Sequence, residues 1–218
     1  MNGPNVYIAI PTYSGNPWYK NTESLLGTFL CLKELGWDCR VNYIAGDPIL
    51  PSVRNKFVAD FMASGCSHLF FIDDDVAWTP KGFVNMVRAG KEVISGMVPI
   101  RQADGYAVVE NGEADGDLVG LDYIGAAFLC IARDAILRMI EFYPGLRCRT
   151  YDSMGDYGYS FFDYEIMDEY LQGEDITFCR RWNKIGKIWG YPGIDFKHKS
   201  VKVIEGNYEQ DKCNADNP

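Results

Sequence analysis

The chain has 218 residues, of which 47% are hydrophobic and 14% aromatic, which excludes a disordered chain and suits one large hydrophobic core. Its formal net charge of -9 argues against a protein that binds nucleic acid through many phosphate contacts. No segment reaches the roughly 18 continuous apolar residues of a membrane span, and the N-terminus lacks a signal-type segment, so we expect a cytoplasmic protein. The seven cysteines show no paired spacing and are expected to be free thiols.

The first hundred residues alternate between strand and helix patterns. Continuous apolar segments indicate buried strands, and apolar residues spaced by three and four indicate helices. In chain order we expect a strand over Val6–Ile10, a loop over Thr12–Pro17, a helix over Thr22–Leu35, a strand over Cys39–Ala45, a helix capped by Ser52, a strand over His68–Ile72, a helix from Pro80 to Ala89 and a strand over Glu92–Val98. This alternation predicts a doubly wound α/β sheet.

The second half is more irregular. We expect a hairpin or a loop in the polar, glycine-rich stretch Arg101–Asp122, a strand over Ala127–Ile131, a helix over Asp134–Phe142, an aromatic insertion over Tyr151–Tyr164, a helix over Glu174–Ile185, a strand over Lys187–Tyr191 and a polar tail after Gly206. No repeat and no interdomain linker interrupts the pattern, so a single domain is predicted.

Three adjacent carboxylates, Asp73, Asp74 and Asp75, directly follow the apolar segment His68–Ile72. Because like charges packed together repel each other, a positive partner is expected beside them. Carboxylate oxygens suit Mg²⁺ or Mn²⁺, which also keep coordination positions for substrate phosphates. Ligands of open α/β sheets bind beyond the carboxyl ends of the strands, where this cluster is predicted to lie. The alternative is an acidic turn with Asp75 as a local cap, and the preceding apolar strand favours the metal site.

Two further features, the Glu174–Asp175 pair and His198, indicate a function only if a metal binds nearby. Glu174 and Asp175 open a predicted amphipathic helix, where the helix dipole favours acidic residues without any function. Next to a metal site, one of these carboxylates is a candidate general base for an acceptor hydroxyl. His198 follows the last strongly apolar segment. A lone histidine is more often structural, and the context of a metal site strengthens the case for a ligand.

In their order and spacing these motifs resemble the GT-A glycosyltransferases, especially small family 2-like members of bacteria and bacteriophages. The resemblance covers nearly the whole chain and is carried by Ile10–Tyr13, Pro51–Asn55, Leu69–Asp75, Gly125–Phe128, Glu174–Asp175 with Phe178 and Arg181, and His198. It implies one GT-A (Rossmann-like) domain over residues 1–218, with a mostly parallel central sheet flanked by helices. Residues 1–100 would form the donor-binding half, about 101–206 the acceptor and catalytic half, and 207–218 a polar tail; a viral member would act in the host cytoplasm.

The resemblance implies a metal site and a donor site. Asp75 is implied as the principal ligand of Mn²⁺ or Mg²⁺, with Asp73 and Asp74 contacting the metal or the donor ribose and His198 as a further ligand. The implied donor is a nucleotide-sugar, most commonly a UDP-sugar. The residues implied around its nucleotide are Pro11, Thr12, Tyr13 and Arg54.

The resemblance also implies a mechanism. In inverting members the aspartate of a late Glu-Asp pair is the base, which implies Asp175 as the base and Glu174 as a positioning residue. A single in-line displacement would follow, in which the metal neutralises the charge of the departing diphosphate. The aromatic stretch Tyr157–Phe162 departs from the family pattern and has no assigned role.

The sequence leaves the acceptor and other activities open. The acceptor hydroxyl could belong to a glycan, a lipid-linked compound or a small molecule. A phage-type enzyme would glycosylate hydroxymethylated pyrimidines in DNA, which the acidic net charge disfavours. A sugar nucleotidyltransferase would also use paired aspartates and magnesium, but it expects an arginine-containing loop after the first strand, and Thr12–Pro17 has no arginine. A carbohydrate-binding module would not need the acidic cluster.

Overall fold

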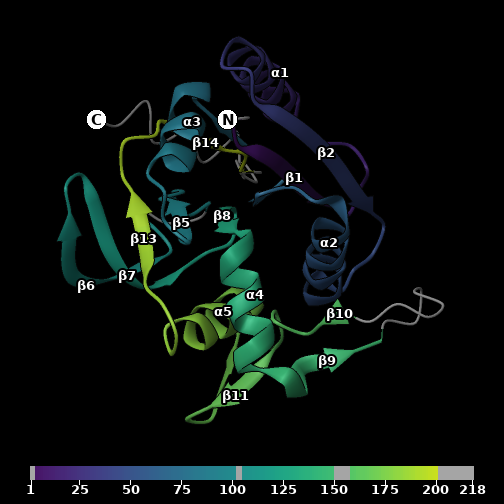
Figure 1. The fold of residues 1–218 in the computed structure, drawn as a ribbon, viewed down its shortest axis with the longest axis vertical. Coiled ribbons are helices and arrows are strands. Elements are labelled where there is room, and N and C mark those ends of the chain that lie inside the picture. Colours follow the sequence, from purple (N-terminus) through teal and green to yellow (C-terminus); the bar gives the residue numbers. More distant parts are fainter. Residues whose placement is uncertain (1–2, 102–104, 150–157, 201–218) are drawn as a thin grey trace, which may run out of the picture.

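The computed structural model describes residues 3–101, 105–149 and 158–200, which form a central sheet with helices on both faces (Figure 1). The sheet has eight strands in the order β2-β1-β3-β8-β5-β13-β7-β6. Its strands are β1 Asn5–Thr12, β2 Asp38–Ala45, β3 His68–Ile72, β5 Val93–Gly96, β6 Val108–Asp115, β7 Leu118–Ile124, β8 Phe128–Ala132 and β13 Ile188–Tyr191.

Five α-helices and three small strand pairs complete the described residues. The helices are α1 Tyr19–Glu34, α2 Leu50–Ser64, α3 Pro80–Arg88, α4 Arg133–Phe142 and α5 Glu174–Trp182, with a short 3-10 helix η1 at Pro144–Leu146. The strand pairs are β4 Val76–Trp78 with β14 Phe196–His198, β9 Arg147–Cys148 with β10 Gly158–Tyr159, and β11 Glu165–Met167 with β12 Tyr170–Gln172. None of these helices has both the length and the apolar character needed to cross a bilayer.

The sheet is mixed because two of its strands run against the others. β1 is parallel to β2 and β3, and β5 is parallel to β13. β8 and β7 are antiparallel to both of their neighbours. Six strands therefore point the same way, as expected for a mostly parallel sheet, although more neighbouring pairs are antiparallel than parallel. A strand covered on both faces is apolar in either direction, so the sequence pattern does not record this difference.

Side chains alternate along β1 between two hydrophobic cores, one on each face of the sheet. Val6, Ile8 and Ile10 pack with residues of α1 and α3, whereas Tyr7 and Ala9 pack with residues of α2, α4 and α5. All five side chains are 5% exposed or less. Burial on both faces explains why this segment reads as a continuous apolar run rather than an apolar-polar alternation.

The predicted elements are present, with shifted ends. The prediction that Ser52 caps the second helix is wrong, because α2 begins at Leu50 and Ser52 lies inside its first turn. Pro51 suits that first turn, since its missing N–H would have no helical partner there. Asp47 Oδ1 accepts a hydrogen bond from the Ile49 N–H (2.9 Å), which fixes the chain just before the helix.

The stretch from Arg101 to Asp122 contains a hairpin, formed by β6 and β7, rather than only a loop. Of the aromatic insertion, residues 158–164 are described, and Phe161 and Phe162 are fully buried in the core shared with α2 and α5. Core packing therefore accounts for these two rings. The predicted tail over 207–218 lies outside the described residues. The six cysteines among the described residues are free thiols.

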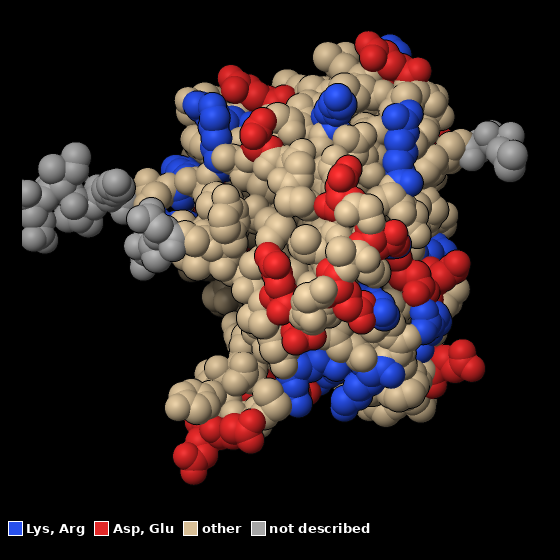
Figure 2. Space-filling model, turned by 90° about the vertical axis from the view of Figure 1, so that its left-hand side faces the viewer, with Lys and Arg blue, Asp and Glu red and all other residues tan. Residues whose placement is uncertain are grey.

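The surface carries charges of both signs. On the face drawn in Figure 2, lysine and arginine side chains lie among aspartate and glutamate side chains rather than in one continuous basic area. This distribution agrees with the acidic net charge of the whole chain.

Candidate functional site

Four strands that run in the same direction end at one edge of the sheet, and the segments that follow them form the candidate site. They are β1, β3, β5 and β13. After β3 come the three aspartates, after β5 comes Arg101, and after β13 the chain returns as β14, which ends in His198. Open α/β sheets bind ligands at this edge because the loops after successive strands meet there.

The turn that carries the aspartates is held by the start of α1. Asn21 is fully buried, and its side-chain amide donates to the carbonyl oxygens of Asp73 (3.0 Å) and Val76 (2.9 Å). The Trp18 N–H donates to the carbonyl of Asp74 (2.9 Å). The backbone of the acidic turn is therefore fixed from behind, which leaves its three carboxylates free to differ in their partners.

The carboxylates of Asp73 and Asp74 are held by partners from α2 and β1. The guanidinium of Arg54, 2% exposed, bridges Asp73 Oδ1 and Glu174 Oε1, with both distances 3.2 Å. The Thr12 hydroxyl donates to Asp74 Oδ2 at 2.5 Å. Arg54 thus lies behind Asp73 and holds its carboxylate. Glu174, 8% exposed, serves the same buried bridge.

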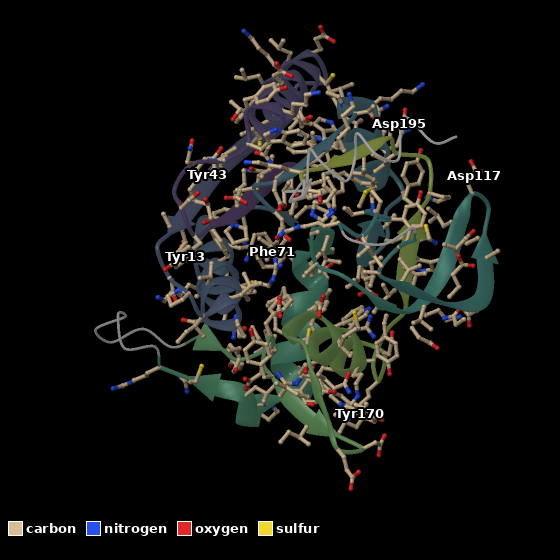
Figure 3. All side chains as sticks on the ribbon, turned by 180° about the vertical axis from the view of Figure 1, so that it is seen from behind. Tyr13, Tyr43, Phe71, Asp117, Tyr170 and Asp195 are labelled. Carbon is tan, nitrogen blue, oxygen red and sulfur yellow. The ribbon has the colours of Figure 1, made fainter. Side chains whose placement is uncertain are left out.

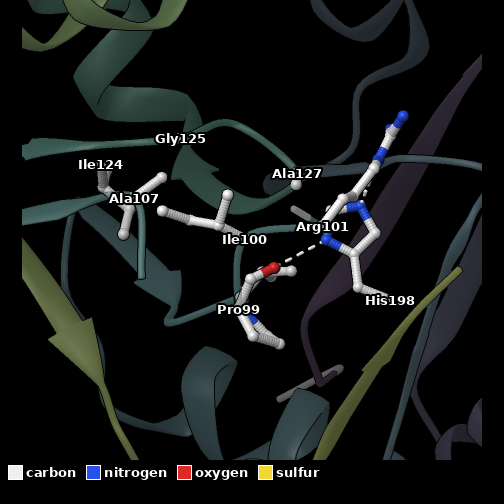
Figure 4. Close-up of a pocket in the computed structure, with 9 residues that line it drawn as sticks. Pro99, Ile100, Arg101, Ala107, Ile124, Gly125, Ala127 and His198 are labelled. Atoms are coloured by element: carbon white, nitrogen blue, oxygen red, sulfur yellow. Dashed lines mark hydrogen bonds between the residues drawn. The ribbon is translucent and has the colours of Figure 1, made fainter. Parts of the chain in front are cut away.

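His198 reaches Asp75 through the pairing of two short strands. β14 runs antiparallel to β4 and places His198 opposite Val76, the residue after Asp75. The distance from His198 Nε2 to Asp75 Oδ1 is 3.4 Å. The other ring nitrogen, Nδ1, lies 2.7 Å from the Pro99 carbonyl, as drawn in Figure 4. A carbonyl only accepts hydrogen bonds, so Nδ1 carries the proton.

The remaining nitrogen of His198 therefore presents a lone pair. Nε2 accepts a hydrogen bond from Arg101 Nε (2.8 Å), which requires this nitrogen to be unprotonated. Asp75 Oδ1 is buried and has no hydrogen-bond partner among the residues that the structure describes. Its second oxygen, Oδ2, lies 2.5 Å from Arg101 Nη2. Two acceptor atoms, Asp75 Oδ1 and His198 Nε2, thus face each other with no proton between them.

The pKa of the Asp75 carboxyl depends on its burial and on the charged groups around it. Burial raises the pKa of its carboxyl above the ordinary value, the Arg101 guanidinium opposes that effect, and the neighbouring Asp73 raises the pKa further. A carboxylate that is costly to ionise when buried is stabilised by a cation beside it. The site therefore favours positive charge at Asp75.

These groups fit a Mg²⁺ or Mn²⁺ ion that is held partly by the protein. Within residues 3–101, 105–149 and 158–200, no three His, Cys, Asp or Glu side chains converge on one point as a complete metal site. Asp75 Oδ1 and His198 Nε2 supply two ligand atoms, one of them an unpartnered buried oxygen. Both ions commonly use one or two protein ligands and complete their shell with water and substrate phosphates.

Three hollows meet at Arg101, and two of them are also lined by Asp75. One of about 300 Å³ is largely apolar and runs between Ile100, Gly125 and His198 (Figure 4). A second lies on the other side of the cluster, next to Trp18 and Lys199. The third contains the loop after β1 and the loop after β2; among its lining residues are Pro11, Thr12, Tyr13, Ile44 and Asp47. Arg101 lines all three hollows.

Asp175, on α5, lies next to Gly125, a residue that lines the apolar hollow. Its Oδ2 lies 3.7 Å from the position that a Cβ on Gly125 would take, and Gly125 lines the hollow. Its other oxygen accepts the Ile176 N–H (2.8 Å). Asp175 is partly exposed, whereas Glu174 is buried. The two neighbouring acids thus have different environments, and Asp175 is the more exposed of the two.

Most of the residues singled out in the sequence come together at this edge. Tyr13 lies at its rim with 73% of its surface exposed, at the periphery of the molecule in Figure 3. Sequence reasoning missed Arg101 and Asn21. Arg101 was detectable, because it follows a predicted strand as the aspartates do. Asn21 lies inside a helix, where no position after a strand marks it as a site residue.

The chain is similar in fold to several proteins of known structure. No family model and no curated protein matches the chain. Among solved structures, A197 from STIV has a TM-score of 0.55 and 12% identity over 93% of this chain and 100% of its own. GalNAc-T7, solved with UDP, GalNAc and Mn²⁺, has a TM-score of 0.52 and 10% identity over 93% of this chain. S. aureus TarS, in complex with UDP, has a TM-score of 0.50 and 11% identity over 91% of this chain.

This chain spans 45% of the GalNAc-T7 chain and 61% of the TarS chain, so it matches only part of each. At sequence identities of 10–12%, these similarities establish the fold of the chain and not its function. The expected GT-A-like α/β fold, with a central sheet flanked by helices, is confirmed.

Proposed function

We propose that the chain is a metal-dependent glycosyltransferase that moves a sugar from a nucleoside-diphosphate donor, most readily a UDP-sugar, to an acceptor hydroxyl with inversion. The observation that carries the proposal is the pair of potential ligand atoms, Asp75 Oδ1 and His198 Nε2, which lie 3.4 Å apart beside hollows at the carboxyl edge of the sheet. Two proteins of this fold were solved with UDP, one of them also with Mn²⁺, which supports the same ligand class here.

In this proposal the nucleotide lies in the hollow lined by Pro11, Thr12 and Tyr13. The exposed ring of Tyr13 offers an aromatic face to the base. The hydrogen bond from Thr12 orients the Asp74 carboxylate toward the donor ribose or the metal. The buried guanidinium of Arg54 acts through Asp73, which it holds, rather than by touching the donor.

In the proposed reaction, groups on one side of the apolar hollow stabilise the departing diphosphate, and Asp175 on the other side activates the acceptor. A Mn²⁺ or Mg²⁺ ion held by Asp75 and His198 would neutralise the negative charge on the departing diphosphate. From α5, Asp175 takes the proton of the acceptor hydroxyl as its oxygen attacks the anomeric carbon. The bond to the diphosphate breaks on the opposite face of the sugar, which inverts the configuration. Glu174 does not touch substrate and positions Arg54.

The two halves proposed from the sequence meet across this hollow. Ile100 ends the donor half, about residues 1–100, whereas Arg101 and Gly125 belong to the acceptor and catalytic half over about 101–206. The acceptor is proposed to be a hydroxyl of a glycan, a lipid-linked compound or a small molecule.

The test is calorimetric titration of UDP into the parent protein and into Asp75→Asn, each with and without Mn²⁺. Mn²⁺ is expected to strengthen UDP binding by the parent, because the ion joins the diphosphate to the protein. The variant is expected to lose this gain, with binding in Mn²⁺ about 100-fold weaker or more, since even indirect supports of a metal site are worth 10–100-fold.

Asp117→Asn is the matched control, because Asp117 is exposed at the turn between β6 and β7, away from the cluster (Figure 3). It removes one carboxylate charge and is expected to behave as the parent does. UDP binding that is equal with and without Mn²⁺ and unaffected by Asp75→Asn would contradict the proposal.

A further inference from the structure

Arg101 occupies the place where a cation is needed. Its Nη2 lies 2.5 Å from Asp75 Oδ2 and its Nε donates to His198 Nε2 at 2.8 Å. One guanidinium therefore contacts both groups that the proposed function assigns to the metal. The planar fork of an arginine suits such bridging, since its donors are fixed in one plane.

The bridge neutralises a site that is short of positive charge. Asp75 has the carboxylates of Asp73 and Asp74 directly before it in the chain. Because His198 is neutral in the tautomer that its hydrogen bonds require, the Arg101 guanidinium is the charge that offsets Asp75 in the described residues. Arg54 is occupied with Asp73 and Glu174.

We infer that Arg101 is an exchangeable counter-ion: it holds Asp75 and His198 in the metal-free protein, yields them to a divalent cation, and then binds the diphosphate of the donor. This inference rests on the proposed function and adds a residue and a sequence of events to it. A guanidinium and a metal ion cannot occupy the same lone pair of His198 Nε2. Metal binding therefore requires Arg101 to move.

Arg101 is placed to make that movement. Its side chain is 51% exposed, so the guanidinium can leave Asp75 without crossing the core. Arg101 lines all three hollows that meet at the cluster, including the one assigned to the nucleotide. A short rotation of its side chain would therefore keep the guanidinium beside the bound donor. Arginine pairs with phosphate oxygens through two parallel hydrogen bonds, which suits a diphosphate.

The first experiment measures Mn²⁺ binding without nucleotide, from the paramagnetic resonance signal of the free ion. Arg101→Met removes the competing charge and adds no metal ligand, so we expect Mn²⁺ to bind about tenfold more tightly than to the parent, as loss of a close charge pair near the surface allows. Arg101→Lys keeps a charge but cannot bridge both groups, and its affinity is expected to lie between the two.

The second experiment measures UDP binding by calorimetry at saturating Mn²⁺. Here Arg101→Met is expected to bind about tenfold more weakly than the parent, because a charge-assisted contact with the diphosphate is lost. A gain for the metal together with a loss for the nucleotide distinguishes exchange from a merely structural role, which would weaken both.

Arg138→Met is the control in both experiments. Arg138 is similarly exposed (43%) and also pairs with an acid, Glu92, but it lies on α4, away from the cluster. It makes the same change in net charge and is expected to match the parent.

The outcomes separate this inference from the proposed function. If Mn²⁺ affinity needs Asp75 but is unchanged or weakened in Arg101→Met, the exchange is wrong and the metal site stands. If the parent binds UDP equally well without Mn²⁺ and Arg101→Met loses that binding, Arg101 replaces the metal permanently, and both the exchange and the metal dependence are wrong.

Discussion

Asp175 and Glu174 are neighbours in sequence, and their different surroundings give them different proposed roles. Glu174 is buried in an ion pair with Arg54, whereas Asp175 is partly exposed beside Gly125. A base must reach both the acceptor and, after reaction, the solvent, which only Asp175 can do. Burial thus separates a positioning acid from a candidate catalytic one.

Replacing Asp175 by Asn is expected to reduce sugar transfer by about 100-fold or more while UDP binding in Mn²⁺ stays within about twofold of the parent, since general bases contribute 10²–10⁴-fold. Asn keeps a side-chain oxygen for the Ile176 N–H, so the start of α5 should be preserved. Product formation followed by mass spectrometry provides the rate. A transfer rate close to that of the parent would remove Asp175 from the mechanism.

His68 offers a prediction on pH and stability. Burial lowers the pKa of its imidazole below the ordinary 6.5, and Asp134 opposes that effect only in part. The unfolded chain therefore takes up a proton at a higher pH than the folded chain does. The stabilisation is fully present above about pH 6.5 and is lost as the pH falls through the lowered pKa.

His68→Gln removes this group, so the parent should lose stability relative to the variant as the pH falls below about 6.5. Urea unfolding at several pH values measures the difference. Other titrating groups are common to both proteins and cancel in the comparison. A difference in free energy of unfolding that does not change with pH would show that His68 has the same pKa in both states.

At the scale of elements, the site depends on β14, a strand of three residues that the sequence did not reveal. It pairs with β4 and packs through Phe196 against Phe128, with ring centroids 5.0 Å apart. Gly96, the last residue of β5, lies under these rings: a Cβ there would overlap the ring of Phe196 and lie 2.9 Å from Phe128 Cδ1. The missing side chain of Gly96 makes room for the strand that carries His198.

Gly96→Ala is therefore expected to destabilise the protein by about 1–3 kcal/mol, the usual cost of overpacking a core. It should also weaken Mn²⁺ binding, because β14 must shift and His198 with it. Urea unfolding and Mn²⁺ titration measure the two effects. Gly145→Ala is the control, since a Cβ at Gly145 would meet nothing within 4 Å. Equal stability of the two variants would contradict this account of Gly96.

At the scale of the whole molecule, charge bears on the class of acceptor. The net charge is -9, and basic side chains lie among acidic ones on the face of Figure 2. Binding to duplex DNA draws much of its free energy from counterions that lysine and arginine release from phosphates. This protein lacks the charge balance for that interaction.

We expect duplex DNA containing hydroxymethylated cytosine to bind no more tightly than about 0.1 mM at physiological salt, which is the weak end of nonspecific binding. Fluorescence anisotropy at two salt concentrations measures this affinity. Tight binding that weakens steeply with salt would instead favour the phage-type DNA glycosyltransferase considered from the sequence.

The sequence by itself determined the α/β alternation, the two-sided burial of β1 and β3, and the position of the aspartates after β3, because these depend on local apolar periodicity and on where a strand ends. It did not determine the antiparallel insertion of β8 and β7, since a strand buried on both faces has the same composition in either direction.

Tertiary structure alone decided which groups meet. The pairing of β14 with β4 brings His198 to Asp75 across more than a hundred residues, and the end of β5 brings Arg101 to both. Such contacts depend on register and strand order, which no local pattern encodes. The sequence indicated the acidic cluster, whereas the contacts of Arg101 with Asp75 and His198 depend on the tertiary structure.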